Sequence, residues 1–164
     1  MGIVEGECEL KVGMDLLCEF ERWTEDRWVY LPVWESESGA PYDTDALSIS
    51  RNYDFFGLLG RDYLSVAPIA LQRGLPDDVT AEVRRIWERV KDDPAISNPS
   101  WVTLDELINY DWNINFRGSM HAVLAEEERS AKEAASDFLT RNLPYIRTLE
   151  ENPRHLRIVF WFGC

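Results

Sequence analysis

The sequence lacks the features that mark several large classes of protein. Its 164 residues include only 3 cysteines and 2 histidines, and none has the short spacing of a zinc site or a C-x-x-C redox motif. The longest apolar run, 158–162, is far shorter than the roughly 18 to 20 residues of a membrane span. The acidic start also lacks the basic and apolar stretches of a signal peptide. We therefore expect no metal or other cofactor, no membrane contact and a cytoplasmic location.

The three cysteines are Cys8, Cys18 and Cys164. Cys8 and Cys18 are expected on one extended segment, roughly 33 Å apart at about 3.3 Å per residue, so they cannot bridge within a strand. The odd number of thiols and the absence of a paired spacing predict that all three are reduced, small apolar side chains.

Basic residues are scarce. The chain has 17 Lys and Arg against 30 Asp and Glu, a formal net charge of −13. The first 50 residues hold 12 of the acids and only 3 bases. Such a balance disfavours direct binding to nucleic-acid phosphates or anionic lipid, so a partner is expected to be basic or neutral.

Apolar residues, in contrast, are plentiful, at 45% of the chain with 12% aromatic. This composition excludes a disordered chain, and the length predicts a single globular domain over 1–164. Near the N-terminus strict alternation predicts a half-buried strand, and Gly13 is a candidate bulge that would reverse the alternation beyond it. The apolar side chains on its even positions are Leu10, Val12, Met14, Leu16, Cys18 and Phe20.

A hairpin and several helices are predicted after this strand. The polar stretch 24–27 indicates a turn, 28–34 a returning strand, and 35–45 a loop. Asn52 is a candidate N-cap for a helix over 53–60. Apolar periodicity over 79–90 predicts a helix with starting signals at 76–78. Thr103 and Glu106 fit a capping box for a helix to Tyr110, after a loop closed by Pro99.

The last third of the sequence mixes both patterns. Residues 112–116 alternate like a strand, and 120–142 are rich in Ala and Glu like a helix. Pro144 either starts a last helical stretch or kinks the helix. Residues 156–162 are a β-branched and aromatic run typical of a central strand. The predicted class is α+β, a mainly antiparallel sheet with an N-terminal hairpin and a C-terminal strand, and helices packed on one face.

The most distinctive feature is a row of acids on the odd positions of the first strand. Carboxylates two residues apart on a strand are about 6.7 Å apart and could imitate a nucleic-acid backbone toward a basic groove. A solvated strand face without a partner would have the same composition. The candidate partner-binding residues are Glu5, Glu7, Glu9, Asp15, Glu19 and Glu21.

Other candidate sites have ordinary explanations. Arg84, Arg85 and Arg89 follow the polar side of one predicted helix, where ion pairs with neighbouring acids are expected. Ser119 near His121 lacks the strand-turn-helix setting of a nucleophile elbow. The aromatic residues of the hairpin could stack a base or a sugar, or could build the core.

Several segments carry a further signal. They are Gly13 to Leu17 with Arg27-Trp28, RNYDFFGLLG at 51–60, RGLPDDVTAEV at 73–83, SWVTLDELINYDW at 100–112 and LRIVFWF at 156–162. Together they resemble an uncharacterised family of bacteriophage and bacterial proteins whose members start near MGCDIH and end near RIVFWFDN. The resemblance covers most of the chain from Gly13 onward, which makes 1–12 an N-terminal extension. It implies a fold and a phage or prophage origin rather than a reaction.

The resemblance also implies that a polar site is missing here. Typical members carry Cys and His in the opening motif, an HSHS stretch before the W/Y-L-T segment and an Asp after the final FWF. Such a set, gathered in space, could form a metal or catalytic site. The corresponding positions are Met14, Leu17, Ser97-Asn98-Pro99-Ser100 and Gly163. The chain therefore resembles a divergent member that keeps the scaffold without that site.

Two functions follow as hypotheses. The first is a non-enzymatic phage accessory protein, anti-CRISPR-like, that binds and inhibits a host defence or nucleic-acid-handling complex in the host cytoplasm. Its partner would be a host protein or nucleoprotein with a basic surface, which the acidic first strand favours. The second is a nucleotide binder or an enzyme acting on host signalling molecules, with a pocket near Asp15, Arg51 and Asp54. The oligomeric state is left open.

Overall fold

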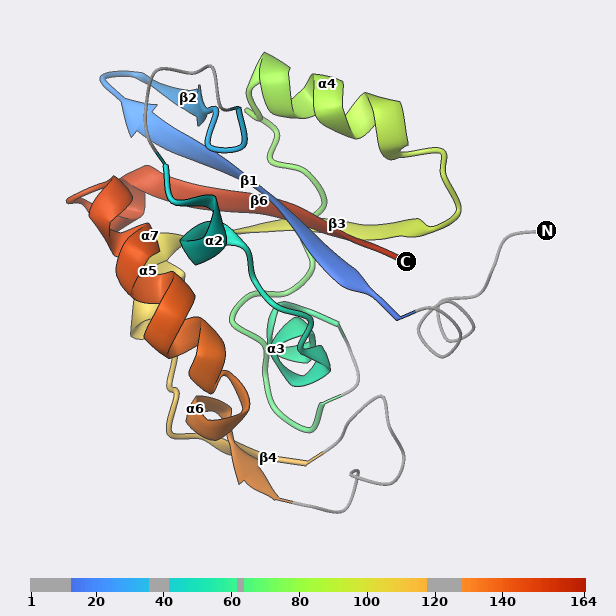
Figure 1. Cartoon of the computed structure of the whole chain (residues 1–164), viewed down its shortest axis with the longest axis vertical. Coiled ribbons are helices and arrows are strands. Elements are labelled where there is room, and N and C mark those ends of the chain that lie inside the picture. Colours follow the sequence, from blue (N-terminus) through green and yellow to red (C-terminus); the bar gives the residue numbers. More distant parts are fainter. Residues whose placement is uncertain (1–12, 36–41, 62–63, 118–127) are drawn as a thin grey trace.

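An antiparallel four-stranded sheet organises the chain (Figure 1). The computed structural model describes residues 13–35, 42–61, 64–117 and 128–164. The strands are β1 (Asp15–Thr24), β2 (Arg27–Leu31), β3 (Ile96–Thr103) and β6 (Leu156–Gly163), in the order β2-β1-β6-β3. Each neighbouring pair is antiparallel. The predicted N-terminal hairpin and central C-terminal strand are confirmed.

Short helices and a second, two-stranded sheet complete an α+β fold, the predicted class. The α-helices are α2 (Thr44–Leu47), α3 (Tyr53–Leu58), α4 (Ala81–Val90), α5 (Leu104–Asn109), α6 (Ala131–Ala134) and α7 (Leu143–Ile146). A π-helical turn spans Phe138–Asn142, and 3-10 turns span Arg147–Leu149 and Pro153–His155. The small sheet pairs β4 (Asn115–Phe116) with β5 (Arg129–Ser130).

Helices cover both faces of the main sheet, not one face as the sequence predicts. The even-numbered side chains of β6 join a core that α2, α3, α5 and α7 also line. Val159 and Trp161 point to the opposite face, where they pack with Val83 and Trp87 of α4. Figure 1 shows α4 on one side of the sheet and α5 with α7 on the other. A strand buried on both faces has a continuous apolar run instead of an alternation, as β6 does.

Local capping signals position three helices. The Asn52 side chain accepts the Phe55 N–H at 3.1 Å and starts α3 as predicted. The predicted capping box of α5 is present, since the Thr103 hydroxyl accepts the Glu106 N–H at 3.1 Å and the Glu106 carboxylate accepts the Thr103 N–H at 3.0 Å. Helix α4 begins at Ala81 with Thr80 as its N-cap, a few residues after the predicted start.

Strand β3 is an element that the sequence does not predict. A loop is expected around Pro99, but the strand runs through it on the edge of the sheet. The register against β6 shifts between Ser97 and Ser100, and Asn98 has a φ of 55°. A proline is compatible with a strand at a bulge on an edge, because no ladder hydrogen bond is required of it there.

The region before β6 differs from the predicted long helix over 120–142. Residues 118–127 lie outside the described part, and Arg129–Ser130 form a strand. The strand predicted over 112–116 is reduced to Asn115–Phe116. The Leu143 N–H donates to the Phe138 carbonyl in a π-helical bond, and α7 follows directly, with Pro144, which has no N–H, as its second residue. Pro144 therefore does not start a helical stretch, because it lies inside a helical run that continues from the π-helical turn to Leu149.

The two cysteines in the described residues differ in oxidation state. Cys18 is a buried free thiol, as predicted, and burial raises the pKa of this thiol far above its ordinary value. Cys164 is disulfide-bonded, so the prediction of a reduced thiol is wrong there. Antiparallel pairing places Gly163 opposite Asp15 and brings the C-terminus beside the start of β1, a proximity that spacing along the chain does not reveal. Cys8 lies outside the described residues.

Candidate functional site

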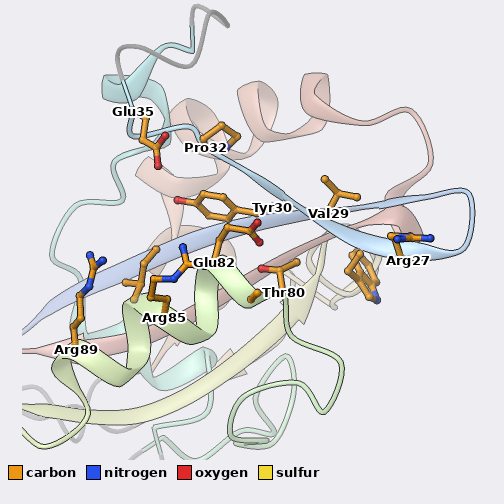
Figure 2. A pocket seen from close by; sticks show the side chains of 12 residues that line it. Arg27, Val29, Tyr30, Pro32, Glu35, Thr80, Glu82, Arg85 and Arg89 are labelled. Atoms are coloured by element: carbon orange, nitrogen blue, oxygen red, sulfur yellow. The ribbon is translucent and has the colours of Figure 1, made fainter.

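A groove of about 800 Å³ lies between β2 and α4 (Figure 2). Ligand sites in proteins commonly have volumes of roughly 300–1,000 Å³. We name it the β2–α4 groove. Its lining residues are Arg27, Trp28, Val29, Tyr30, Pro32 and Glu35 on the hairpin side, and Thr80, Ala81, Glu82, Arg85, Ile86 and Arg89 on the helix side.

The hairpin side of the groove is the free edge of the sheet. Strand β2 is the outermost strand and pairs only with β1. Four successive residues from Arg27 to Tyr30 line the groove. Because successive side chains of a strand point to opposite faces, a groove on one face of the sheet would contact only every second residue. The groove therefore follows the edge of the strand. Within the described chain, no second strand lies beside this edge. An edge strand leaves one row of backbone N–H and C=O groups available.

The helix side carries arginines without partners. In the described part of the chain, none of Arg84, Arg85 and Arg89 forms an ion pair, so the predicted pairing with neighbouring acids is wrong. Glu88, on the same helix, pairs instead with Lys91 at 2.6 Å. Arg85 and Arg89 line the groove, whereas Arg84 does not. Two unpaired guanidinium groups therefore face this groove in a protein with a net charge of −13.

A buried charge network holds α4 against the sheet. Glu21 and Arg157 face each other across β1 and β6, are 0% and 2% exposed, and are joined by a 2.7 Å hydrogen bond from Arg157 Nε. The second Glu21 oxygen accepts the N–H of Thr80, the N-cap of α4, at 2.7 Å. Arg157 also donates to the Asp78 carboxylate at 2.8 Å and lies over the Trp28 ring at 4.1 Å. These bonds fix the N-terminal end of α4 relative to the hairpin.

Glu19 is a half-buried carboxyl group beside the groove. The Tyr30 hydroxyl donates to Glu19 Oε2 at 3.0 Å. The pKa of Glu19 is raised to about 7: burial is the main cause, the hydrogen bond from Tyr30 opposes it, and the charges of Glu35 and Glu21 add to it. Burial is also the main reason that the pKa of the Tyr30 hydroxyl is raised. Glu19 therefore titrates near neutral pH.

Replacing Glu19 by glutamine (Glu19→Gln) is expected to stabilise the protein more at pH 8 than at pH 5. The ordinary pKa of this carboxyl is 4.5 and its folded value is about 7. Between these values the folded state holds a proton that the unfolded chain has released, so stability falls as pH rises and the penalty is complete above about pH 7. Thermal unfolding between pH 5 and 8 measures the difference. Glu151→Gln, at an exposed position, is the control. A Glu19→Gln gain that does not grow with pH would contradict the expectation.

The predicted acidic face is not one exposed surface. Outside the described residues lie Glu5, Glu7 and Glu9. Asp15 is exposed and pairs with Arg51 at 3.0 Å, and Glu19 is half-buried. The prediction is wrong for Glu21, because α4 covers this face of β1 and the carboxylate is fully buried against Arg157. Acid side chains do alternate on β1, but a helix lies over part of the row.

Of the residues predicted near a pocket, Asp15, Arg51 and Asp54, the structure brings only the first two into contact. Asp15 and Arg51 form an exposed ion pair. Asp54 pairs instead with Arg129 of β5, through bonds of 2.5 and 2.8 Å. A hollow of about 210 Å³ is lined by Arg51 but by neither aspartate. The structure thus assigns the two carboxylates to different ion pairs.

Metal-ligating side chains do not gather in the described ranges. No three His, Cys, Asp or Glu residues there could hold a metal ion. His155 contacts the Asn152 side chain through Nε2 at 3.4 Å, and His121 lies outside these ranges. In the same ranges no helix is long and apolar enough to cross a membrane.

The positions where the resembled family carries polar residues meet at one end of the sheet. Gly163 pairs with Asp15 on β1 and with Ile96 on β3, next to Ser97. A Cβ atom at Gly163 would lie 3.3 Å from Leu17 Cδ1 and 3.1 Å from Ile96 Cδ1, so apolar side chains already crowd this position. In this chain the sheet end is therefore closed to a larger side chain unless its neighbours move.

Comparison with known proteins yields no relative, because no family model, curated protein or solved structure matches the chain. The resemblance to the bacteriophage family stays a prediction, and the function has to be argued from the site itself.

Proposed function

We propose that this protein is a non-enzymatic interaction protein whose β2–α4 groove holds a segment of a partner protein. One observation carries the proposal: an unpaired strand edge and two unpaired arginines border the same groove. The strand edge offers directional backbone hydrogen bonds and the arginines offer charge. Both remain unused within the described chain.

The kind of partner protein expected from the sequence fits this binding mode. The partner is a host protein complex that handles nucleic acid or acts in defence, and binding in the cytoplasm inhibits it. The net charge of −13 supports a partner with a basic surface, since complementary charge speeds association and makes it sensitive to salt. Variants of the N-terminal acids and of the groove arginines test the two contributions one at a time.

Site-directed photo-crosslinking tests the groove. Val29 is 42% exposed and lines the groove, whereas Leu71 is 77% exposed and does not. With photoreactive p-benzoylphenylalanine in place of Val29, we expect one protein of a bacterial host lysate to be crosslinked. The same replacement of Leu71 is the control and should not crosslink that protein. Equal crosslinking from both positions, or none from Val29, would contradict a partner in the groove.

Two multiple variants then distinguish binding through the groove from attraction by the N-terminal glutamates. Arg85→Gln/Arg89→Gln should reduce the crosslink from position 29 at every salt concentration. Glu5→Gln/Glu7→Gln/Glu9→Gln should mainly slow association at low salt, because it removes acidic charge and replaces none of the named lining residues of the groove. If only the glutamate variant has an effect, the partner is bound by the acidic excess and the groove proposal is wrong.

A further inference from the structure

We infer that the groove recognises an extended acidic segment, which adds as a further strand along β2 and places two carboxylates against Arg85 and Arg89. The inference rests on the proposed function and names the chemistry of the partner segment. Three features of the groove support this inference. They are the spacing of Arg85 and Arg89 along α4, the free edge of β2, and a local electrostatic field that favours an anion.

The pitch of the two arginines matches that of a strand. Arg85 and Arg89 are four residues apart on α4, which corresponds to about 6 Å along a helix that rises about 1.5 Å per residue. Side chains two residues apart on an extended segment are about 6.7 Å apart and point to the same face. Two acids separated by one residue therefore meet both guanidinium groups, whereas adjacent acids point to opposite faces.

The free edge of β2 orients such a segment. A strand beside β2 would extend the sheet and present alternate side chains to α4, which covers that face. Figure 2 shows Arg85 and Arg89 on the helix side and Tyr30 and Pro32 on the strand side. The exposed Val29 offers an apolar contact along the same edge. Strand addition of this kind gains affinity from main-chain bonds and specificity from alternate side chains.

The overall negative charge does not prevent an acidic segment from binding. Charges farther away than about 8 to 10 Å are largely screened at physiological salt, so the local arrangement dominates. Glu82 and Glu35 also line the groove, and Glu82 lies about one turn before Arg85. The two glutamates repel acidic side chains of the bound segment except near Arg85 and Arg89. The segment can therefore bind in only one register along β2.

Fluorescence polarisation with a labelled peptide tests the inference on the full chain. The probe is a heptapeptide whose two glutamates are separated by one valine and flanked by valine and threonine. We expect saturable binding that weakens with salt and falls by at least about tenfold in Arg85→Gln/Arg89→Gln, which removes two charge-assisted contacts. Arg84→Gln is the matched control, since Arg84 is exposed on the same helix, unpaired and outside the groove. It should bind like the unmodified chain.

Three altered probes examine the mode of binding. Replacing both glutamates by lysine, placing them next to each other, or N-methylating alternate amides should each weaken binding by about tenfold or more. Equal affinity for the adjacent-glutamate peptide, or no effect of Arg85→Gln/Arg89→Gln, would overturn the inference. So would arginine-dependent binding of ATP without binding of the peptide. If Val29 crosslinks a partner but the peptide does not bind, the inference fails and the proposed function stands.

Discussion

Replacing Arg157 by methionine (Arg157→Met) is expected to lower the free energy of unfolding by about 3–5 kcal/mol, the range for breaking a buried ion pair. Arg157 is 2% exposed and bonds to both Glu21 and Asp78. Methionine fills similar space but leaves the carboxylate of Glu21, 0% exposed, with only the Thr80 N–H as a described hydrogen-bond donor. The cost arises mainly from that uncompensated buried charge.

Urea unfolding at pH 7 measures this loss of stability, and a double-mutant cycle shows how much of it comes from the Glu21–Arg157 pair. Glu21→Gln with Arg157→Met removes both charges, so the double variant should be much less destabilised than the two single losses predict together. Arg154→Met is the control, because the Arg154 side chain is 80% exposed and its pair with Asp105 is 4.0 Å long. It should change stability by no more than about 0.5 kcal/mol. Additive losses in the cycle would show that the Glu21–Arg157 pair does not determine the effect.

The same variant links stability to the proposed site. Arg157 connects the central strand to Asp78, just before α4, and lies over Trp28 of the hairpin. When Arg157 is replaced, Asp78 loses its bonds to the central strand, and of the buried charge network only the bond from the Thr80 N–H to Glu21 still holds this end of α4. We therefore expect Arg157→Met to weaken peptide binding in the groove although Arg157 is not among its lining residues.

Local patterns determined most of what could be predicted of the fold. The alternation before Phe20, the apolar run 156–162 and the capping box at Thr103 depend on neighbours within a few residues, and each gives the predicted element. The loop expected at Pro99 is wrong because pairing with β6 outweighs the local preference, and a bulge accommodates the proline. Similarly, the π-helical turn before Pro144 leaves no mark in the composition of the segment.

The candidate site could be predicted only in part, because its two sides are far apart in the sequence. Residues 27–35 and 80–89 meet only when α4 packs on the second face of the sheet. One signal for this packing was present: Arg157 is the single charge within a strand that is otherwise apolar and buried. Such an arginine requires a buried partner, and the odd face of the first strand supplies one in Glu21. Thus an acid that could be taken for a contact residue has a structural role.

Replacing Phe160 by alanine (Phe160→Ala) is expected to cost about 3–5 kcal/mol, the usual range for a fully buried phenylalanine. Phe160 is 1% exposed, lies on the central strand between Cys18 and Ser100, and contacts the Phe162 ring edge-on with centroids 5.9 Å apart. Strands β1 and β3 on both sides hold the backbone of β6. The surrounding structure can therefore collapse only partly into the cavity that the missing ring leaves. The loss therefore includes a cavity term in addition to the lost apolar transfer free energy.

Urea unfolding should show a lower midpoint with an unchanged slope, since the surface exposed on unfolding is almost the same. Phe160→Leu keeps part of the volume and should lose less, which keeps the comparison possible if the alanine variant is too unstable to isolate. Leu71→Ala, at a position 77% exposed, should stay within about 0.5 kcal/mol of the unmodified chain. An apolar cavity of this kind stays dry and can bind benzene, so benzene should raise the melting temperature of Phe160→Ala more than that of Leu71→Ala. A loss below about 1 kcal/mol without a benzene effect would mean that the core on this face of the sheet repacks freely around Phe160 and is less tightly packed than the burial of that side chain implies.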